Sequence, residues 1–260
     1  MRVVTPLLLA PDEPPAWHIE HADGRSDYVL ICDHAGNRLP RRLGTLGLDE
    51  DALASHIAWD IGAGAVASGL GDALDACVVL QPYSRLVIDC NRPPGSADSI
   101  VSRSERTTIP GNVAISRTQV AARESEIFVP YHAHIRELLD ARLRRGQPTL
   151  LVSLHSFTPV YLGVPRPWHA AVLYNRDPRL ARLVARALRD EGGLVVGENE
   201  PYAVSDDTDY AIPRYGEARG LPHVELEIRQ DLIDDAAGQS AWTERLARLL
   251  LQVHSGLCGC

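Results

Sequence analysis

Three short apolar runs constrain the fold of this chain most strongly. Residues 29–32 lead into Asp33 and His34, residues 150–154 lead into His155, and residues 224–228 carry Glu225 and Glu227. Runs of this length are typical of buried strands in a parallel sheet, and such strands present functional groups at their carboxyl ends. The three runs therefore predict that two imidazoles and a carboxylate meet at one edge of a sheet.

Strand patterns and helix patterns alternate along the rest of the chain. We expect further strands at 76–80, 85–90 and 170–174, and helices at 49–74 with an interruption near Ile61 and Gly62, at 119–145 with a break near Pro130, at 178–191 and at 241–253. This order predicts an α/β three-layer sandwich with a mainly parallel, mixed sheet.

A single domain is expected over residues 1–260, because no linker divides two apolar halves. Residues 1–27 hold four prolines and are expected to form an irregular arm. Residues 255–260 are expected to form a loose tail.

Charge and cysteine content narrow the class of function. The net charge of −8 argues against nucleic acid or an anionic membrane as a partner, because phosphate binding needs a positive face. No apolar run approaches the ~18 residues of a membrane span. The five cysteines lack the paired spacing of a zinc ribbon, and the first ten residues make a poor signal peptide, so a cytoplasmic protein is expected.

The two strand-end histidines favour a metal site. A catalytic zinc ion needs three protein ligands and one open position for water. His34 and His155 are the first two candidate ligands, and Asp60, an acid among apolar residues before a helix break, is the third. A helix cap or a salt bridge would also explain Asp60, and Asp33 and His56 compete with it as ligands.

Alternation along residues 224–228 places Glu225 and Glu227 on one face of the predicted strand. A carboxylate there could take a proton from a metal-activated water and return it to a leaving amine. We expect Glu227 to be this general base, with surface ion pairing to Arg229 as the alternative.

A cationic segment precedes a long polar loop at 91–112. Arg85, Asn91 and Arg92 could hold a substrate carboxylate, because a guanidinium matches it with two parallel hydrogen bonds. A structural pair between an arginine and Asp89 is the alternative. Arg103 and Arg106 lie nearby and favour a second negative charge on the substrate.

Together these motifs resemble the N-formylglutamate amidohydrolase family, from the first strand to residue 233. The matching blocks are 33–37 with Pro40, 59–63, 84–86 through 91–93, 109–112, 153–157, 199–202 and 227–233. The resemblance implies a zinc-peptidase-like α/β fold, related to that of the zinc carboxypeptidases. It also implies hydrolysis of an N-acyl amino acid and a place in histidine degradation.

The resemblance also assigns roles. Zn²⁺ would be held by His34, Asp60 and His155, because Asn37, which replaces a glutamate ligand of the carboxypeptidases, is a poor ligand. Glu227 would be the catalytic residue. The substrate would be bound or oriented by Arg85, Asn91, Arg92 and Arg229, with Gly111 and Asn112 shaping the pocket mouth. Tyr215 stands where the family commonly has a histidine, so its phenol could donate in that residue's place.

We therefore expect zinc-dependent hydrolysis of an acidic N-acyl amino acid, with N-formylglutamate, cleaved to formate and glutamate, as the leading substrate. The alternatives are a zinc peptidase or cell-wall amidase acting on a larger substrate, and a non-catalytic anion-binding protein with the same fold.

Overall fold

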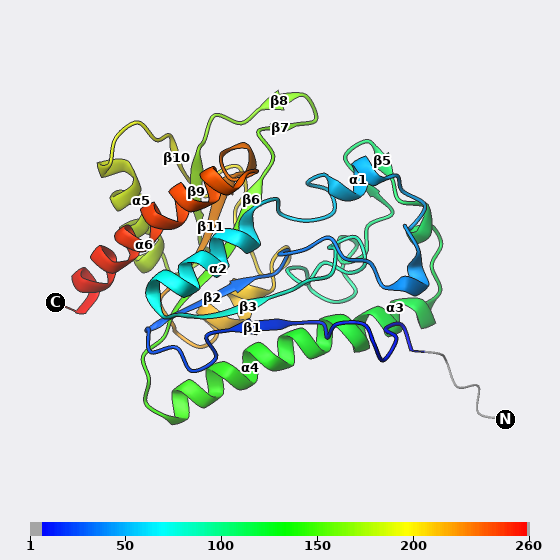
Figure 1. Ribbon diagram of the computed structural model, residues 1–260, viewed down its shortest axis with the longest axis horizontal. Coiled ribbons are helices and arrows are strands. Elements are labelled where there is room, and N and C mark those ends of the chain that lie inside the picture. Colours follow the sequence, from blue (N-terminus) through cyan, green and yellow to red (C-terminus); the bar gives the residue numbers. More distant parts are fainter. Residues whose placement is uncertain (1–6, 259–260) are drawn as a thin grey trace.

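The computed structural model describes residues 7–258, and their main sheet has seven strands (Figure 1). Its strand order is β1 (His18–Glu20), β3 (Cys77–Leu80), β2 (Tyr28–Cys32), β6 (Leu150–Phe157), β11 (His223–Arg229), β9 (Ala170–Leu173) and β10 (Val196–Glu198). The β3–β2, β2–β6, β6–β11 and β9–β10 pairs are parallel, whereas β1 joins β3 and β9 joins β11 in antiparallel fashion. The expected mainly parallel, mixed sheet is confirmed.

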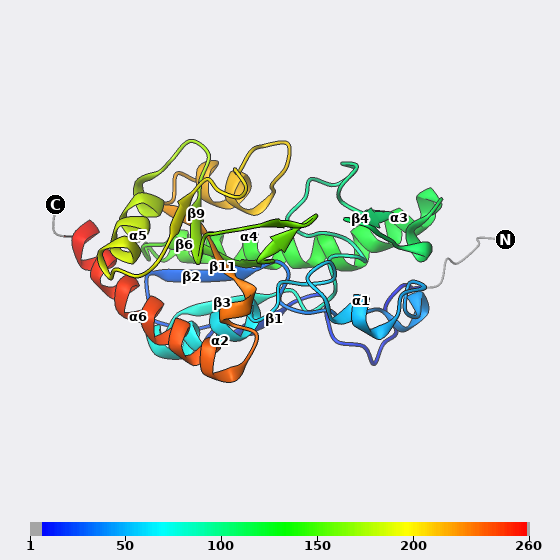
Figure 2. The ribbon, with the colours of Figure 1, turned by 90° about the horizontal axis from the view of Figure 1, so that it is seen from above.

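Helices cover both faces of this sheet (Figure 2). On one face, α2 (Ala63–Leu74), α5 (Arg179–Asp190) and α6 (Ala236–Cys258) bury their apolar side chains against the strands. On the other face, α4 (Val129–Arg144) packs through Tyr131, Ile135 and Leu139. The three-layer sandwich is therefore confirmed. Within residues 7–258, each helix is too short or too polar to span a membrane.

The central strands are buried because both faces are covered. Every residue of β2 and β6 is buried. In β11, Val224, Leu226 and Ile228 join the core beside α5 and α6, so Glu225 and Glu227 lie on the opposite face, as the alternation predicts.

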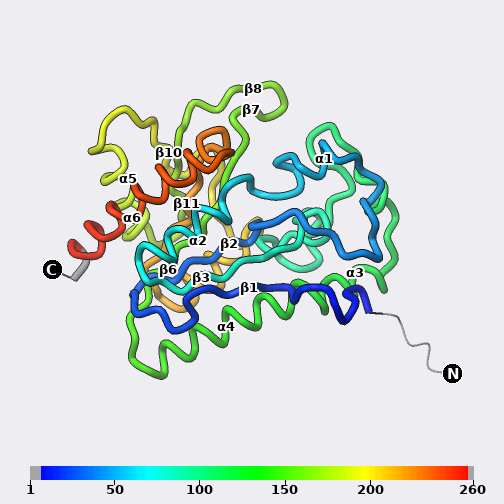
Figure 3. The backbone as a smooth tube through the Cα atoms, in the orientation of Figure 1, coloured from blue at the N-terminus to red at the C-terminus, as the bar shows by residue number. Residues whose placement is uncertain are grey.

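Short elements frame the carboxyl ends of these strands. A hairpin of β7 (Val160–Tyr161) and β8 (Val164–Pro165) extends from the end of β6, as the backbone trace shows (Figure 3). The remaining short elements are α1 (Glu50–Ala54), β4 (Arg103–Ser104), β5 (Thr107–Thr108), the 3₁₀ turns Arg41–Leu43, Pro110–Asn112 and Gln230–Leu232, and the π-helical turn Ile212–Glu217.

The segment 85–90 is not the strand that its apolar residues suggest. Its backbone groups bond to turns and loops instead: the Arg85 N–H donates to Ala58 O at 3.1 Å, and the Asp89 N–H donates to Ser99 O at 2.8 Å. Leu86, Val87 and Ile88 are buried all the same. Burial alone therefore explains the apolar run, and the expected strand is wrong.

Both chain ends also differ from expectation. Within the arm 1–27, His18–Glu20 form the edge strand β1, while residues 1–6 lie outside the described part. At the other end, α6 continues to Cys258, so residues 255–258 are helical, not a loose tail. Residues 259–260 lie outside the described part.

Both predicted helices are interrupted, but not at the expected residues alone. The 49–74 pattern divides into α1 and α2, with residues 55–62 outside both helices. The 119–145 pattern divides into α3 (Arg117–Arg123), a π-helical turn (Glu124–Phe128) and α4. Pro130 lies in the first turn of α4, where its missing N–H is tolerated.

Candidate active site

Three adjacent parallel strands bring the predicted site residues together. His34 lies two residues beyond β2, and His155 and Glu227 lie directly opposite each other on β6 and β11. His155 is inside its strand and not at the end, because β6 continues to Phe157. The predicted meeting of two imidazoles and a carboxylate at this edge is present.

Asp60 reaches the same edge from the turn before α2. Its backbone N–H donates to His34 O at 3.0 Å, and its Oδ2 accepts from the Ser156 N–H at 3.3 Å. The turn requires Gly62, which has φ +78° and would place a Cβ 2.1 Å from Ile233 O. A close backbone approach thus fixes the carboxylate of Asp60 over the sheet edge.

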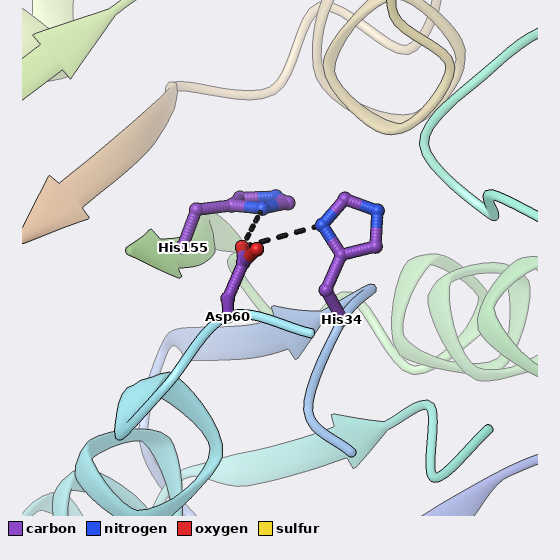
Figure 4. A group of neighbouring side chains, drawn as sticks. All are labelled: His34, Asp60 and His155. Atoms are coloured by element: carbon purple, nitrogen blue, oxygen red, sulfur yellow. Dashed lines mark hydrogen bonds and ion pairs between the residues drawn. The ribbon is translucent and has the colours of Figure 1, made fainter. Parts of the chain in front are cut away.

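His34, Asp60 and His155 form a buried group that could hold a metal ion (Figure 4). Asp60 Oδ2 lies 3.2 Å from Nδ1 of His34 and 2.8 Å from Nδ1 of His155. One ligand atom from each residue lies within 4.8 Å of the other two. The side chains point toward one another from three different elements.

The outer nitrogens of both imidazoles have the partners that metal-ligating histidines require. Nε2 of His34 lies 2.7 Å from Asp89 Oδ1, and Nε2 of His155 lies 3.0 Å from Ser153 Oγ and 3.5 Å from Asp33 Oδ2. Such partners orient the ring and leave Nδ1 facing the metal. Two nitrogens and one carboxylate oxygen, with a cavity beside them, fit zinc.

Charge at this group favours a bound cation. Burial would raise the pKa of Asp60, but His34 and His155 hold it well below its ordinary value. Burial and Arg85 would lower the pKa of His34, yet Asp89 and Asp60 raise it. Without a metal, protons on the imidazoles therefore balance the carboxylates, and a metal ion would compete with those protons.

Glu225 and Glu227 differ in their contacts although both are buried. Burial raises the pKa of each carboxyl above its ordinary value and outweighs His155, which lowers it, while nearby carboxylates raise it further. Glu225 accepts a hydrogen bond from Asn91 Nδ2 at 3.4 Å, whereas Oε2 of Glu227 is buried and has no partner among the described residues. Both carboxyls line the cavity, and Asn91 holds the one of Glu225.

A cavity of about 500 Å³ opens beside these groups. Its volume suits a small molecule. Seven of the predicted site residues line it: His34, Asp60, Arg85, Asn91, Arg92, His155 and Glu227.

Arg85 and Arg92 are both already paired inside the protein. Arg85 donates to Asp89 Oδ2 at 2.6 Å and to Asp60 Oδ1 at 3.3 Å. Arg92 donates to Asp209 Oδ1 at 3.3 Å. Each keeps about a quarter of its side chain exposed, so unused N–H groups face the cavity region. The pair of Arg85 with Asp89 is the structural alternative foreseen for this segment.

Four other predicted residues lie outside the cavity lining. Gly111 approaches the backbone of Leu46 closely, and Asn112 holds the carbonyls of Leu86 and Val101, both at 2.8 Å. Their contacts shape the loop behind the cavity.

Tyr215 and Arg229 also contact the protein itself. The Tyr215 hydroxyl lies 2.9 Å from Nδ1 of His132, and Arg229 pairs with Asp231 at 2.7 Å. A role for Gly111, Asn112, Tyr215 or Arg229 in substrate binding stays a prediction.

The sequence analysis did not assign a role in the site to several residues around the cavity. Asp89 supports His34, Asp209 holds Arg92, and Tyr202 lines the wall. Tyr202 falls in the matching block 199–202, which was the available signal. His56, a competing ligand candidate, instead bonds Glu105 at 2.9 Å.

The fold and the buried group together define an α/β protein with a candidate metal centre at the carboxyl edge of its sheet. A model of the N-formylglutamate amidohydrolase family matches residues 26–234. The chain belongs to that family, and membership implies amidohydrolase activity.

Solved structures agree with this assignment. A gene product of Agrobacterium tumefaciens is 37% identical, with a TM-score of 0.93 over 96% of this chain and 99% of that one. An N-formylglutamate amidohydrolase from Ralstonia eutropha shares the fold at 20% identity, with a TM-score of 0.69 over 95% of this chain and 100% of that one. No curated protein matches by sequence.

Proposed function

We propose that this chain hydrolyses the N-acyl bond of an acidic N-acyl amino acid, with N-formylglutamate as the leading substrate and Zn²⁺ as the cofactor. The observation that carries the proposal is the convergence of His34, Asp60 and His155 beside the unpartnered oxygen of Glu227, all on one cavity. The cavity volume supports a small substrate over a peptide or a cell-wall polymer.

His34, Asp60 and His155 would hold the zinc ion. When bound there, zinc would polarise the acyl carbonyl and make water acidic enough to react near neutral pH. Asp89 and Asp33 would keep the Nδ1 atoms of the two imidazoles directed at the ion through their outer nitrogens.

Glu227 would move the proton. Its raised pKa, caused mainly by burial, suits a group that takes a proton from water and returns it to the leaving amine. Glu225 would remain hydrogen-bonded to Asn91 and fix the position of that side-chain amide. Asn91 is further fixed because its Oδ1 accepts from the backbone N–H groups of Tyr210 and Ala211, both at 3.1 Å.

Arg85, Asn91 and Arg92 would hold the α-carboxylate of the substrate. All three line the cavity, and their positions are fixed by bonds to Asp89, Glu225 and Asp209. Fixed donors lose little freedom on binding. The cytoplasmic location and the place in histidine degradation stay predictions.

The proposal is tested by incubating the zinc-loaded protein with a panel of N-formyl and N-acetyl amino acids and measuring release of the free amino acid. We expect N-formylglutamate and N-formylaspartate to give a higher kcat/KM than N-formylalanine. Turnover of muramoyl peptides or ordinary peptides, without turnover of N-formyl amino acids, would contradict it.

A further inference from the structure

The arginines that line the cavity are already engaged by the protein, which limits what they offer an acidic substrate. Seven carboxyl groups, three histidines and three arginines line the cavity. Arg85 and Arg92 are paired with protein carboxylates, and Arg103 is exposed and donates to Glu105 O at 3.1 Å. A buried negative group on the substrate therefore needs a further cation that the protein has not already used.

Arg166 is such a cation. It follows the β7–β8 hairpin, it is only 8% exposed, and it forms no ion pair with a carboxylate in residues 7–258. Its Nη1 is buried and has no hydrogen-bond partner among those residues. Its backbone is fixed on both sides, since its N–H donates to Pro159 O at 2.8 Å and its carbonyl accepts from Arg229 at 3.4 Å.

Arg166 is not itself part of the cavity lining, but its guanidinium stacks on three aromatic rings that are. Its Cζ lies 4.7 Å from the ring centres of Tyr161 and Tyr202 and 5.9 Å from that of Phe157. All three rings line the cavity. Tyr161 and Tyr202 are also 40% and 43% exposed, so both have room to turn aside.

Stacking on aromatic rings offsets only part of the cost of burying a cation that has no carboxylate partner. An anionic group on a ligand would offset more of it. Tyr202 shows how near this charge is to the reacting groups: burial and Glu227 raise the pKa of its phenol, while Arg166 and Arg85 lower it.

We propose that Arg166 is the specificity-determining residue that binds the side-chain carboxylate of the substrate, between Tyr161 and Tyr202. Arg92 comes from the loop after residue 90, and Arg166 comes directly after β8, so two distant segments of the chain supply the two arginines. A dicarboxylic substrate would place one carboxylate at each. This inference rests on the proposed function, because it assumes an acidic N-acyl amino acid.

The test compares N-formyl-L-glutamate with its neutral isostere N-formyl-L-glutamine. We expect Arg166→Gln to lower kcat/KM for N-formylglutamate about 10- to 100-fold, mainly through KM, and to change N-formylglutamine less than about threefold. An equal loss with both substrates, or a wild-type preference for the glutamine compound, would overturn the proposal.

Two further variants control this experiment. Arg245→Gln removes another stacked arginine, whose Cζ lies 4.9 Å from Trp242 on α6, and should leave both substrates unchanged. If circular dichroism shows that Arg166→Gln does not fold, Arg166→Lys decides. Its point charge cannot match two oxygens, so the preference should fall at least about fivefold. An unchanged preference would refute the role.

Calorimetric titration separates this inference from the proposed function. Zinc-loaded wild type should bind L-glutamate at least about tenfold more tightly than L-glutamine, and Arg166→Gln should remove the difference. Wild type that binds both equally, or neither, refutes the role of Arg166. Absence of turnover with every N-formyl amino acid refutes the proposed function, whatever the titration gives.

Discussion

At the scale of single residues, Glu225 and Glu227 show how contacts assign different roles to like groups. They are neighbours on one face of β11, and both are buried with raised pKa values. Asn91 donates a hydrogen bond to Oε2 of Glu225, whereas Oε2 of Glu227 is buried without a hydrogen-bond partner among the described residues. The proposed proton-transfer role rests on this difference and not on the strand pattern alone.

We therefore expect Glu227→Gln to lower kcat by roughly 10²- to 10⁴-fold while zinc content is unchanged. Glu225→Gln, the matched control, should lower kcat far less. Steady-state kinetics and elemental analysis of both variants make the comparison. Equal losses, or a larger loss for Glu225→Gln, would move the role to the other carboxyl.

Asp60 and Asn37 provide a second comparison between residues. Asp60 Oδ2 contacts both imidazoles, whereas Asn37 donates to Leu53 O at 2.9 Å away from the metal group. Asp60→Asn should weaken zinc binding by at least about tenfold, because a neutral amide does not balance the charge of the ion. Asn37→Ala should have little effect. A competitive chelator titration that gave the reverse order would contradict Asp60 as a ligand.

At the scale of elements, turns and helix contacts fix the site. The turn before α2 closes only because Gly62 lets it approach Ile233. Substituting Gly62→Ala should destabilise the fold by more than about 2 kcal/mol and disturb Asp60.

Gly95 is the control for this substitution. It has the same positive φ, +78°, but a Cβ added there would meet no atom within 4 Å. Gly95→Ala should therefore cost only about 1 kcal/mol. Urea denaturation measures both free energies of unfolding. Similar values for the two variants would show that the close approach to Ile233 does not matter.

Helix α4 is tied to the segment 85–91 through His132. Its Nε2 donates to Cys90 O at 2.8 Å, and its Nδ1 lies 2.9 Å from the Tyr215 hydroxyl, which also donates to His132 O at 3.1 Å. Burial lowers the pKa of His132 to about 4, below the ordinary value of about 6.5 in an unfolded chain. Between these pH values the unfolded chain binds a proton that the folded chain does not, so stability is lost as pH falls.

The free energy of unfolding should therefore decrease by up to roughly 3 kcal/mol through this residue as pH falls from about 6.5 to 4. His132→Gln should be less stable at pH 7 but lose less on acidification. Urea denaturation at several pH values measures the difference between the two proteins. Parallel curves would exclude this origin of acid sensitivity.

Elements differ in how far their sequence predicts them. Strands β6 and β11, which carry His155 and Glu227, and β2, which leads to His34, could be recognised because both faces of the sheet bury their apolar runs. Segment 85–90 could not, since its apolar residues are buried in a loop whose hydrogen bonds depend on Ala58 and Ser99, outside the segment itself. The partner of Tyr215 and the exposed position of Tyr202 likewise depend on contacts between distant segments.

At the scale of the whole molecule, the candidate metal ligands His34, Asp60 and His155 link β2, β6 and the turn before α2. An ion that binds only the folded chain stabilises it. Zinc at about 100 times its Kd should raise the Tm of the metal-free protein by roughly 5 °C, and His155→Ala should show no such rise. Differential scanning fluorimetry with and without zinc measures this. An equal rise in the variant would place the stabilising ion elsewhere.

The protons on the two imidazoles also have a consequence for metal uptake. In the metal-free chain, nearby carboxylates raise the pKa of His34 and of His155, so both rings hold protons beside the buried carboxylates. An ion that takes the Nδ1 atoms of these rings must displace those protons. Each ion that enters therefore releases acid, and an unbuffered solution of the protein should fall in pH as it takes up metal.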